Sequence, residues 1–337
     1  MSDAEGSHAD HASPGDDHDA EHLSVTVPSL MEGMRVDRAL SMLTGCSRAE
    51  ASRMIADAVV SVDGRPVAKA SSPLSEGSLL EAVLPVVHEM VVEPEGDVDV
   101  VIVEEASSFI VVNKWFDQVV HPGAGNVQGT LIAGVLARYP EIAELPAQGC
   151  GEANRPGVVH GLDKGTSGLL VIARTPEGFH SLTEQIAERS VQRRYLGIVE
   201  GRLENEQGII EAPIGRSPST PTRMTVRADG RAARTDYVVL DRGATSARTL
   251  VALSLHTGRT HQIRVHMAAI DHPIVNDPRY GQRNERALDP DRLALHAGRL
   301  AFEDPATGAV RSFVARWPED LGPLGFDEEA AGWLEGA

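Results

Sequence analysis

An acidic segment divides the chain into two regions of different pattern. Residues 88–105 hold seven acidic residues and no Lys or Arg, and apolar periodicity differs on the two sides of this segment. Such a change in composition is typical of a domain boundary. We expect a disordered acidic, His-rich tail over 1–22, a small domain over 23–88, an acidic linker over 89–99, a larger domain over 100–316 and an acidic tail over 317–337.

The net charge of −18 is unevenly distributed. Residues 1–24, 88–105 and 317–337 contain 20 of the 49 acidic residues and no Lys or Arg, so the remainder, with 29 acids and 31 basic residues, is close to neutral. Acidic tails are typically solvated, and a near-neutral body can still carry a basic groove. RNA is therefore a possible partner.

Three observations on composition limit the class of protein. No apolar run is long enough to span a membrane, and the N-terminus lacks the basic and apolar regions of a signal peptide. The two cysteines, Cys46 and Cys150, are too few for a disulfide framework or a cysteine-based zinc site. We therefore expect a cytoplasmic protein with no membrane association.

The first region combines two helices and a hairpin. RVDRALSMLTG has one apolar helical face, Ser47 to Glu50 forms a capping box that begins a second helix, and VVSVDGRPV predicts two strands around an Asp63-Gly64 turn. This order resembles the S4 RNA-binding domain, in which basic residues at the start of the second helix face RNA. Arg48 and Arg53 match that role, and the nearby Arg35 and Arg38 are further residues from which we expect RNA contact. The alternative is that they are ordinary solvated charges.

The second region contains an unusual loop. RPGVVHGLDKGTSGLLVIA places Asp163 in a glycine-flanked turn between two apolar runs that we expect to be strands. A carboxylate held at such an edge is a candidate nucleophile or general base. The alternative is a turn residue that caps local N–H groups.

Two further segments carry aromatic and basic residues. Thr175 and Pro176 predict the start of a helix, which is followed by a strand that Tyr195 opens. Tyr195 is a candidate aromatic platform for a base, beside arginines that can bind phosphate. The alternative is a half-buried tyrosine at the end of a strand. The segment 250–281 predicts a strand and then a helix capped by Thr260, with Arg259 and Arg264 off its apolar face. Two histidines of this segment, His261 and His266, are five apart, a spacing that does not fit a zinc helix pair.

These blocks together resemble pseudouridine synthases of the RluA/RluD type. The matching segments, in family order, are HPGAGN (121–126), HGLDKGTSGLLVIA (160–173), RRYLGIVEG (193–201), HTGRTHQIRVHMAAIDHPIVNDPRYG (256–281) and LALHAGRLAF (293–302). The resemblance covers residues 100–316 and implies an α+β protein, with a mixed, mainly antiparallel sheet flanked by helices after the S4-like domain. An N-terminal S4 domain is also found in the RluD branch.

The resemblance also implies site residues and chemistry. Asp163 matches the essential aspartate, Tyr195 the tyrosine that stacks on an extruded uridine, and Arg264 the arginine that pairs with the aspartate. The reaction implied needs no metal and no cofactor, and the sequence has no phosphate-binding glycine loop. Two positions depart from the family loop, because Gly161 replaces an arginine and Gly165 an aspartate. We expect RNA contacts from the basic groups near the loop and the tyrosine: His160, Lys164, Arg193, Arg194 and Arg259.

We therefore expect an RNA pseudouridine synthase, an isomerase that flips its uridine out of the RNA stack. Ribosomal RNA of the large subunit is the expected substrate, transfer RNA is a possible one, and a monomer is expected. One alternative is an RNA-binding or ribosome assembly factor in which Gly161 has weakened catalysis. A carboxylate-based hydrolase of nucleosides or glycosides is a further alternative, although the loop supplies one acid where a glycosidase needs two.

Overall fold

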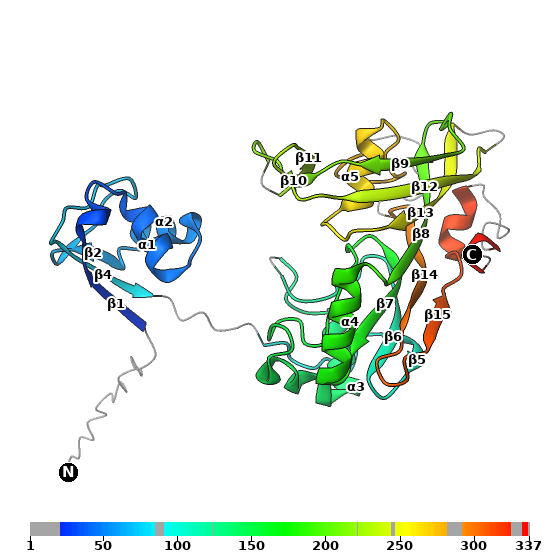
Figure 1. Cartoon of the computed structure of the whole chain (residues 1–337), viewed down its shortest axis with the longest axis horizontal. Helices are drawn as coiled ribbons and strands as arrows, with labels where there is room; N and C mark the ends of the chain where they lie inside the picture. Colours follow the sequence, from blue (N-terminus) through cyan, green and yellow to red (C-terminus); the bar gives the residue numbers. More distant parts are fainter. Residues whose placement is uncertain are drawn as a thin grey trace, which may run out of the picture. The chain divides into compact units, whose positions relative to one another are not determined.

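The computed structural model divides the chain into two units, Met1–His88 and Glu89–Ala337 (Figure 1). It describes residues 21–84, 91–123, 125–220, 222–243, 247–281, 292–324 and 332–335. The expected N-terminal tail lies almost wholly outside the described residues.

The N-terminal unit is a small α+β domain. Its sheet has the order β1-β4-β2-β3 and its helices pack against that sheet through Leu40, Ile55 and Leu80. The elements are β1 (Glu21–Thr26), η1 (Ser29–Met31), α1 (Val36–Thr44), α2 (Arg48–Ala56), β2 (Val60–Val62), β3 (Arg65–Pro66) and β4 (Leu79–Leu84). The predicted capping box is present, since the Ser47 hydroxyl accepts from the Glu50 N–H and the Glu50 carboxylate from the Ser47 N–H.

The C-terminal unit is built on one nine-stranded mixed sheet. The strands follow the order β5-β6-β7-β14-β8-β13-β12-β9, and β15 pairs with β14. Every pairing is antiparallel except that of β14 with β7. The strands are β5 (Val101–Glu105), β6 (Phe109–Lys114), β7 (Ser167–Ala173), β8 (Gln192–Glu200), β9 (Gln207–Glu211), β12 (Arg234–Asp241), β13 (Arg248–Leu255), β14 (Leu295–Glu303) and β15 (Val310–Val314). The expected fold class is confirmed.

Helices cover both faces of the β5–β7 part of the sheet (Figure 1). Since side chains alternate along a strand, Val112 and Leu170 pack with α3 (Leu131–Arg138), whereas Val111 and Val171 pack with α4 (Pro176–Glu188). The strands are therefore apolar on both sides, which explains the continuous run SGLLVIA of β7. The other elements are η2 (Pro140–Glu144), η3 (Pro146–Gln148), β10 (Ile214–Arg216), β11 (Met224–Val226), α5 (Gln262–Ala269), η4 (Glu319–Leu324) and α6 (Gly332–Glu335).

β7 and β14 approach closely where the loop that carries Asp163 ends. Gly168 has a φ of +115°, and a Cβ at this position would overlap the Ala297 carbonyl. Only glycine combines this backbone conformation with such close contact. The loop that precedes β7 is thus fixed against the centre of the sheet.

The segment expected to be a linker packs on the C-terminal unit instead. Val92 is buried in the core beside α3, and a Cβ at Gly134 of that helix would lie 2.9 Å from Val98. The Glu95 carboxylate accepts a hydrogen bond of 2.9 Å from the Gly129 N–H. The sequence predicted a linker because acidic residues outnumber the few apolar residues that pack against α3.

Described residues of the expected C-terminal tail are likewise part of the core. Trp317, Leu321 and Leu334 are buried with strands β8, β13 and β14, and Asp320 pairs with the buried Arg292 at 2.8 Å. The prediction of a solvated tail was wrong. The acidic residues of 317–337 are more numerous than these three apolar residues, but the three apolar residues pack into the core.

Two smaller expectations differ from the structure. The run before Asp163 forms only an isolated bridge, Val158 to Ile172, rather than a strand. The N-cap of α5 is His261, in a left-handed conformation with φ of 57°, rather than Thr260. Among the residues that the structure describes, no helix has the length and apolarity to cross a membrane.

Candidate active site

A cavity of about 630 Å³ opens where three segments of the C-terminal unit meet. The walls come from the loop that carries Asp163, from β8 and from the loop between β13 and α5. Among its described lining residues, Asp163 is the single acidic one, and five are arginines: Arg155, Arg189, Arg193, Arg259 and Arg264. Such a cavity is suited to an anionic ligand.

Backbone hydrogen bonds hold the loop that carries Asp163. The Thr166 N–H donates to the Asp163 carbonyl at 3.0 Å, and the Val171 N–H donates to His160 Nε2 at 3.2 Å. On the side of β6, the fully buried ammonium of Lys114 donates to the carbonyl of Lys164 at 3.1 Å. These contacts restrain the backbone on both sides of the carboxylate, as a positioned nucleophile requires.

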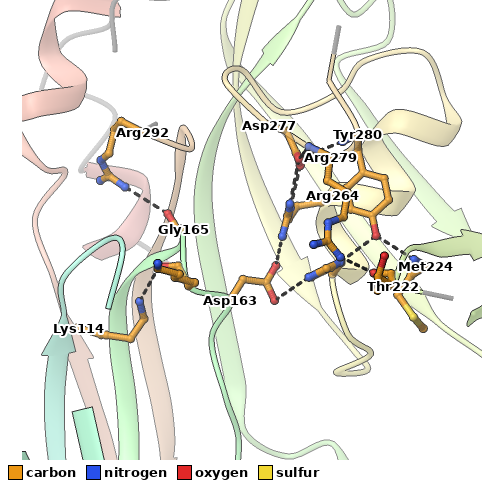
Figure 2. A network of polar contacts seen from close by, with 12 residues as sticks. Lys114, Asp163, Gly165, Thr222, Met224, Arg264, Asp277, Arg279, Tyr280 and Arg292 are labelled. Carbon is orange, nitrogen blue, oxygen red and sulfur yellow. Dashed lines mark hydrogen bonds and ion pairs between the residues drawn. The ribbon is translucent and has the colours of Figure 1, made fainter. Parts of the chain in front are cut away.

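A chain of ion pairs then fixes the Asp163 side chain (Figure 2). Arg264 Nη1 donates to Asp163 Oδ2 at 2.9 Å, while its Nε and Nη2 donate to the two oxygens of Asp277 at 2.7 and 2.9 Å. Asp277 is fully buried and also accepts from the N–H groups of Arg279 and Tyr280. One carboxylate therefore orients the guanidinium, and the guanidinium orients the other carboxylate.

The electrostatics keep Arg264 and Asp277 ionised. Burial opposes the charge on Arg264, yet its hydrogen bonds to Asp277 and the charge of Asp163 raise the pKa of Arg264 above its usual range. For Asp277, burial is likewise outweighed by the bonds from Arg264, and its pKa is lowered. Asp163 Oδ2 is thus committed to Arg264, whereas Oδ1 accepts no hydrogen bond from a described residue.

His261 lies beside that unengaged oxygen. Its Nε2 is 4.0 Å from Asp163 Oδ1, and its Nδ1 is 2.8 Å from the Tyr280 hydroxyl. Burial lowers the pKa of His261, and the nearby charge of Asp163 opposes this shift only in part. A neutral, oriented imidazole therefore neighbours the carboxylate.

Tyr195 lines the cavity from β8 and is almost fully buried. Burial raises the pKa of its hydroxyl to about 12, so the phenol is protonated at neutral pH. The structure thus brings together the three residues that the sequence predicted as catalytic: Asp163, Tyr195 and Arg264.

Arg193 is a buried arginine without a counter-charge. Arg193 is 7% exposed, its Nε has no hydrogen-bond partner, and no described carboxylate pairs with its guanidinium. Arg193 lines the cavity on the same face of β8 as Tyr195, which follows it by two positions. A buried cation of this kind is unfavourable unless an anion joins it.

The arginine between them points elsewhere. Because side chains alternate along β8, Arg194 lies over the Trp333 ring at 5.1 Å and does not line the cavity. Burial, followed by the charge of Arg299, lowers its pKa. Strand alternation thus places Arg193 and Arg194 on opposite faces of β8, although we expected RNA contact from both.

Two other residues expected to contact RNA differ from each other. His160 is a half-buried residue of the cavity wall, and desolvation, with a further effect of the Arg193 charge, lowers its pKa to about 3, so it anchors the loop as a neutral residue. Arg259 stays at the cavity, where burial and the charges of Arg231 and Arg189 lower its pKa. These three arginines, Arg189, Arg231 and Arg259, form a basic cluster with no carboxylate partner among the described residues.

In the N-terminal unit, the four predicted RNA-binding arginines are exposed. Arg35 is bound to Asp37 through two hydrogen bonds, the shorter of 2.6 Å, so its charge is largely compensated. Arg38, Arg48 and Arg53 form no ion pair with a described residue. The latter three remain the stronger candidates of this set.

Comparison with known proteins agrees with this geometry. The family model described as RNA pseudouridylate synthase matches residues 108–269, and the S4 domain model matches residues 34–80. The chain is 36% identical over 322 residues to the ribosomal large subunit pseudouridine synthase D of Nitrosomonas europaea, a match that covers 94% of this chain and 90% of that protein. The chain belongs to the RNA pseudouridylate synthase family.

Further relatives support the assignment over nearly the whole chain. The ribosomal large subunit pseudouridine synthase D of Escherichia coli K12 is 36% identical over 311 residues, with 89% of this chain and 92% of that protein covered. Among solved structures, human RNA Pseudouridylate Synthase Domain Containing 1 aligns with a TM-score of 0.55 at 26% identity, and covers 73% of this chain. The synthase is therefore an isomerase of RNA with an N-terminal S4 domain, and the predicted family is confirmed.

The two departures from the family loop differ in their surroundings. A Cβ at Gly161 of the synthase would meet no atom within 4 Å, so this position opens into free space at the cavity wall. A Cβ at Gly165 would lie 3.2 Å from Leu293, and the Gly165 carbonyl accepts from Arg292 (Figure 2). Gly165 is thus packed, whereas Gly161 is not.

Sequence reasoning missed three residues of the site: Lys114, His261 and Asp277. Asp277 is 13 residues beyond Arg264, in a loop after α5, and only the fold reveals that it orients the arginine. Lys114 ends a buried strand, and a lone lysine after four buried positions was the available signal. His261 was weighed only as a metal ligand; among the described residues, no cluster of His, Cys, Asp and Glu suits a metal.

Lys114 makes the stability of the synthase depend on pH. Burial lowers the pKa of Lys114 from 10.5 to about 7 in the folded protein. Between these values the unfolded chain binds more protons than the folded one, so this group's contribution to the free energy of unfolding rises as pH rises from about 7 toward 10.5.

Lys114→Met removes this titration. We expect the stability of the unsubstituted protein, relative to Lys114→Met, to increase across that pH window in urea unfolding experiments. Other titrating groups cancel in the difference, whatever offset the lost carbonyl contacts produce. Parallel pH profiles for the two proteins would show that Lys114 does not titrate abnormally.

Proposed function

We propose that this synthase isomerises specific uridines of large-subunit ribosomal RNA, with Asp163 as the nucleophile. The observation that carries the proposal is a carboxylate fixed by Arg264 in a cavity that Tyr195 lines and whose other described charged residues are all basic. Its relatives from Nitrosomonas europaea and Escherichia coli bear the name ribosomal large subunit pseudouridine synthase D. The similarity to both extends over about nine-tenths of the chain.

The chemistry follows from the two oxygens of the carboxylate. Asp163 Oδ1, which is not engaged by a described donor, attacks C1′ of the flipped uridine, and the bond from C1′ to N1 breaks with its electron pair leaving on the uracil. The uracil turns within the cavity, its C5 attacks C1′, and the bond to Asp163 breaks. C5 then loses its proton and N1 gains one, so the reaction is a balanced isomerisation.

Each neighbouring residue contributes to this sequence. Arg264 stabilises the negative charge of Asp163 whenever the carboxylate is free, and Asp277 holds the guanidinium in place. Tyr195 provides a buried ring on which the detached uracil stacks. A cavity of about 630 Å³ is large enough for a nucleoside and for the rotation of its base.

The arginines of the cavity serve the RNA backbone. Arg193 lies within electrostatic reach of Tyr195 and His160, and it has no carboxylate partner among the described residues. A phosphate beside the flipped uridine supplies the missing counter-charge. The cluster of Arg189, Arg231 and Arg259 extends this positive potential toward neighbouring phosphates.

The two alternatives receive less support. A glycosidase or nucleoside hydrolase of the two-carboxylate type needs a second acid, and no other described residue lining the cavity is acidic. The hypothesis of a binding factor with weakened catalysis rests on Gly161. The ion pairs that join Asp163, Arg264 and Asp277 form without any contribution from position 161. RNA contact by the S4 domain, action as a monomer and location in the cytoplasm complete the proposal.

Mapping of pseudouridines in ribosomal RNA tests the proposed substrate. We expect one or a few large-subunit sites to be missing from cells that lack the gene, and to return when the unsubstituted protein is supplied. A complete set of large-subunit sites together with missing sites in transfer RNA would replace the proposed substrate. A complete set in both RNAs would favour the binding factor.

Arg193 allows binding and stability to be separated. Arg193→Met removes a buried, uncompensated charge, so we expect the free energy of unfolding of the free protein to rise by roughly 1 kcal/mol. The same change should weaken RNA affinity about tenfold and reduce the salt dependence by about one counter-ion.

The matched control is Arg194→Met, one residue further along β8. This variant loses the contact with Trp333 but no cavity-lining charge, so RNA affinity should stay within about twofold while stability falls slightly. Equal effects of both variants on RNA affinity would contradict the assignment of Arg193 to a phosphate.

A further inference from the structure

A second cavity, of about 600 Å³, lies next to the first and shares two of its residues. His261 and Arg264 line both cavities, while Phe116, Lys164 and Arg279 line only the second. The Asp163–Arg264 ion pair is therefore bordered by open space on more than one side. Nothing in the reaction itself requires this second space.

A short aromatic loop borders the second cavity. Phe116 lines it and packs against the guanidinium of Arg292, whose Cζ lies 4.7 Å from the ring centroid. The preceding residue, Trp115, is 58% exposed, although a large indole is normally buried in a protein of this kind. Two adjacent aromatic residues are thus presented beside the active site, one fixed and one open to solvent.

The buried Lys114 ammonium holds this aromatic loop against the catalytic loop. Its Nζ donates to the carbonyls of Trp115 at 2.7 Å, of Gln118 at 2.8 Å and of Lys164 at 3.1 Å. Because one nitrogen contacts all three carbonyls, the backbone of Trp115 is adjacent to that of Lys164. The exposed indole of Trp115 consequently lies on a residue whose backbone is next to Lys164, the residue that follows Asp163.

The basic groups of the second cavity are available to a ligand. Lys164 pairs with Asp117 at 3.1 Å, but the two side chains are 49% and 72% exposed, so this pair is weak. Arg279 is exposed, donates to the Thr222 carbonyl and has no carboxylate partner among the described residues. Phe116 lines the same cavity as these two cations, and aromatic rings combined with cations are the arrangement that binds single-stranded nucleic acid.

The covalent structure of RNA then identifies the occupant, given the proposed function. A uridine held at Asp163 in the first cavity remains joined to both neighbouring nucleotides, so one of them must lie within a single phosphodiester linkage of the site. We propose that the second cavity binds the nucleotide adjacent to the target uridine. Its phosphate lies in the cavity and contacts Lys164 and Arg279, and its base stacks on the exposed indole of Trp115.

This subsite has a definite role in the reaction. Extrusion of the target uridine removes its stacking on the neighbouring base, which costs free energy. Stacking of that neighbour on the aromatic loop restores part of this energy and keeps the RNA in the open conformation. The subsite therefore favours uridines whose neighbour is unpaired, without reading the target base itself.

Kinetics with RNA labelled at C5 of uridine test the subsite. The assay follows tritium released from an unmodified large-subunit ribosomal RNA transcript that contains [5-³H]uridine, because the isomerisation removes the hydrogen from C5. Trp115→Ala should raise KM about tenfold and leave kcat within about twofold, as expected for a lost stacking contact. Arg279→Gln should raise KM and reduce the salt dependence of binding by about one counter-ion.

Two controls match the variants in exposure and contacts. Val310→Ala removes an exposed apolar side chain that is 76% exposed on β15, and Arg202→Gln removes an exposed arginine that donates to a single carbonyl at 3.1 Å. Both controls should leave KM and kcat unchanged. Activity of the unsubstituted protein on the same transcript tests the proposed function separately.

Each outcome has one meaning. A higher KM in both variants, with kcat retained, supports the subsite. An unchanged KM in active protein, or a loss confined to kcat, overturns the subsite and leaves the proposed function standing. Absence of tritium release by the unsubstituted protein overturns the proposed function, and the subsite with it.

Discussion

The ion pair between Asp163 and Arg264 is the interaction on which the rest of the site depends. A single carboxylate in a basic cavity has several arginines within reach, and a nucleophile is useful only if one oxygen is held and the other left open. The bidentate contact with the buried Asp277 commits Arg264 to one orientation, so that only Nη1 reaches Asp163. A buried pair of this kind contributes little net stability, and its value here is geometric.

Charge in the cavity is arranged around that pair. Arg264 carries two carboxylate partners, whereas Arg193 and the cluster of Arg189, Arg231 and Arg259 have none among the described residues. The uncompensated charges raise the free energy of the empty site and are offset when RNA phosphates enter. Stability of the free protein and affinity for RNA are thus opposed at the same residues, which is the usual relation at a functional site.

Local patterns of sequence were sufficient for elements whose determinants lie within a few residues. The capping box of α2, the Thr175 N-cap of α4 and the loop that carries Asp163 all belong to this class. Composition was misleading where few apolar residues lie among many acids: Val92 and Val98 attach the supposed linker to α3, and Leu334 packs beside Gly298 of β14.

The remaining features of the site required the fold. Asp277 orients Arg264 from the loop that follows α5, and the Lys114 ammonium joins two loops 50 positions apart. No spacing in the sequence encodes these contacts. The separation of Arg193 from Arg194 was in principle predictable from strand alternation, once β8 was known to begin at Gln192.

The most direct test of this account is the rate of tritium release from [5-³H]uridine in ribosomal RNA by Asp163→Asn. Asparagine keeps the size of the side chain and a hydrogen-bond acceptor for Arg264, but it removes the nucleophilic charge. We predict a fall in kcat of about a thousandfold or more, with RNA affinity within about threefold of the unsubstituted protein. Asp229→Asn, at an exposed carboxylate that pairs with Arg227, is the control and should retain full activity. Release by Asp163→Asn within tenfold of the unsubstituted rate would contradict the assignment of Asp163 as the nucleophile.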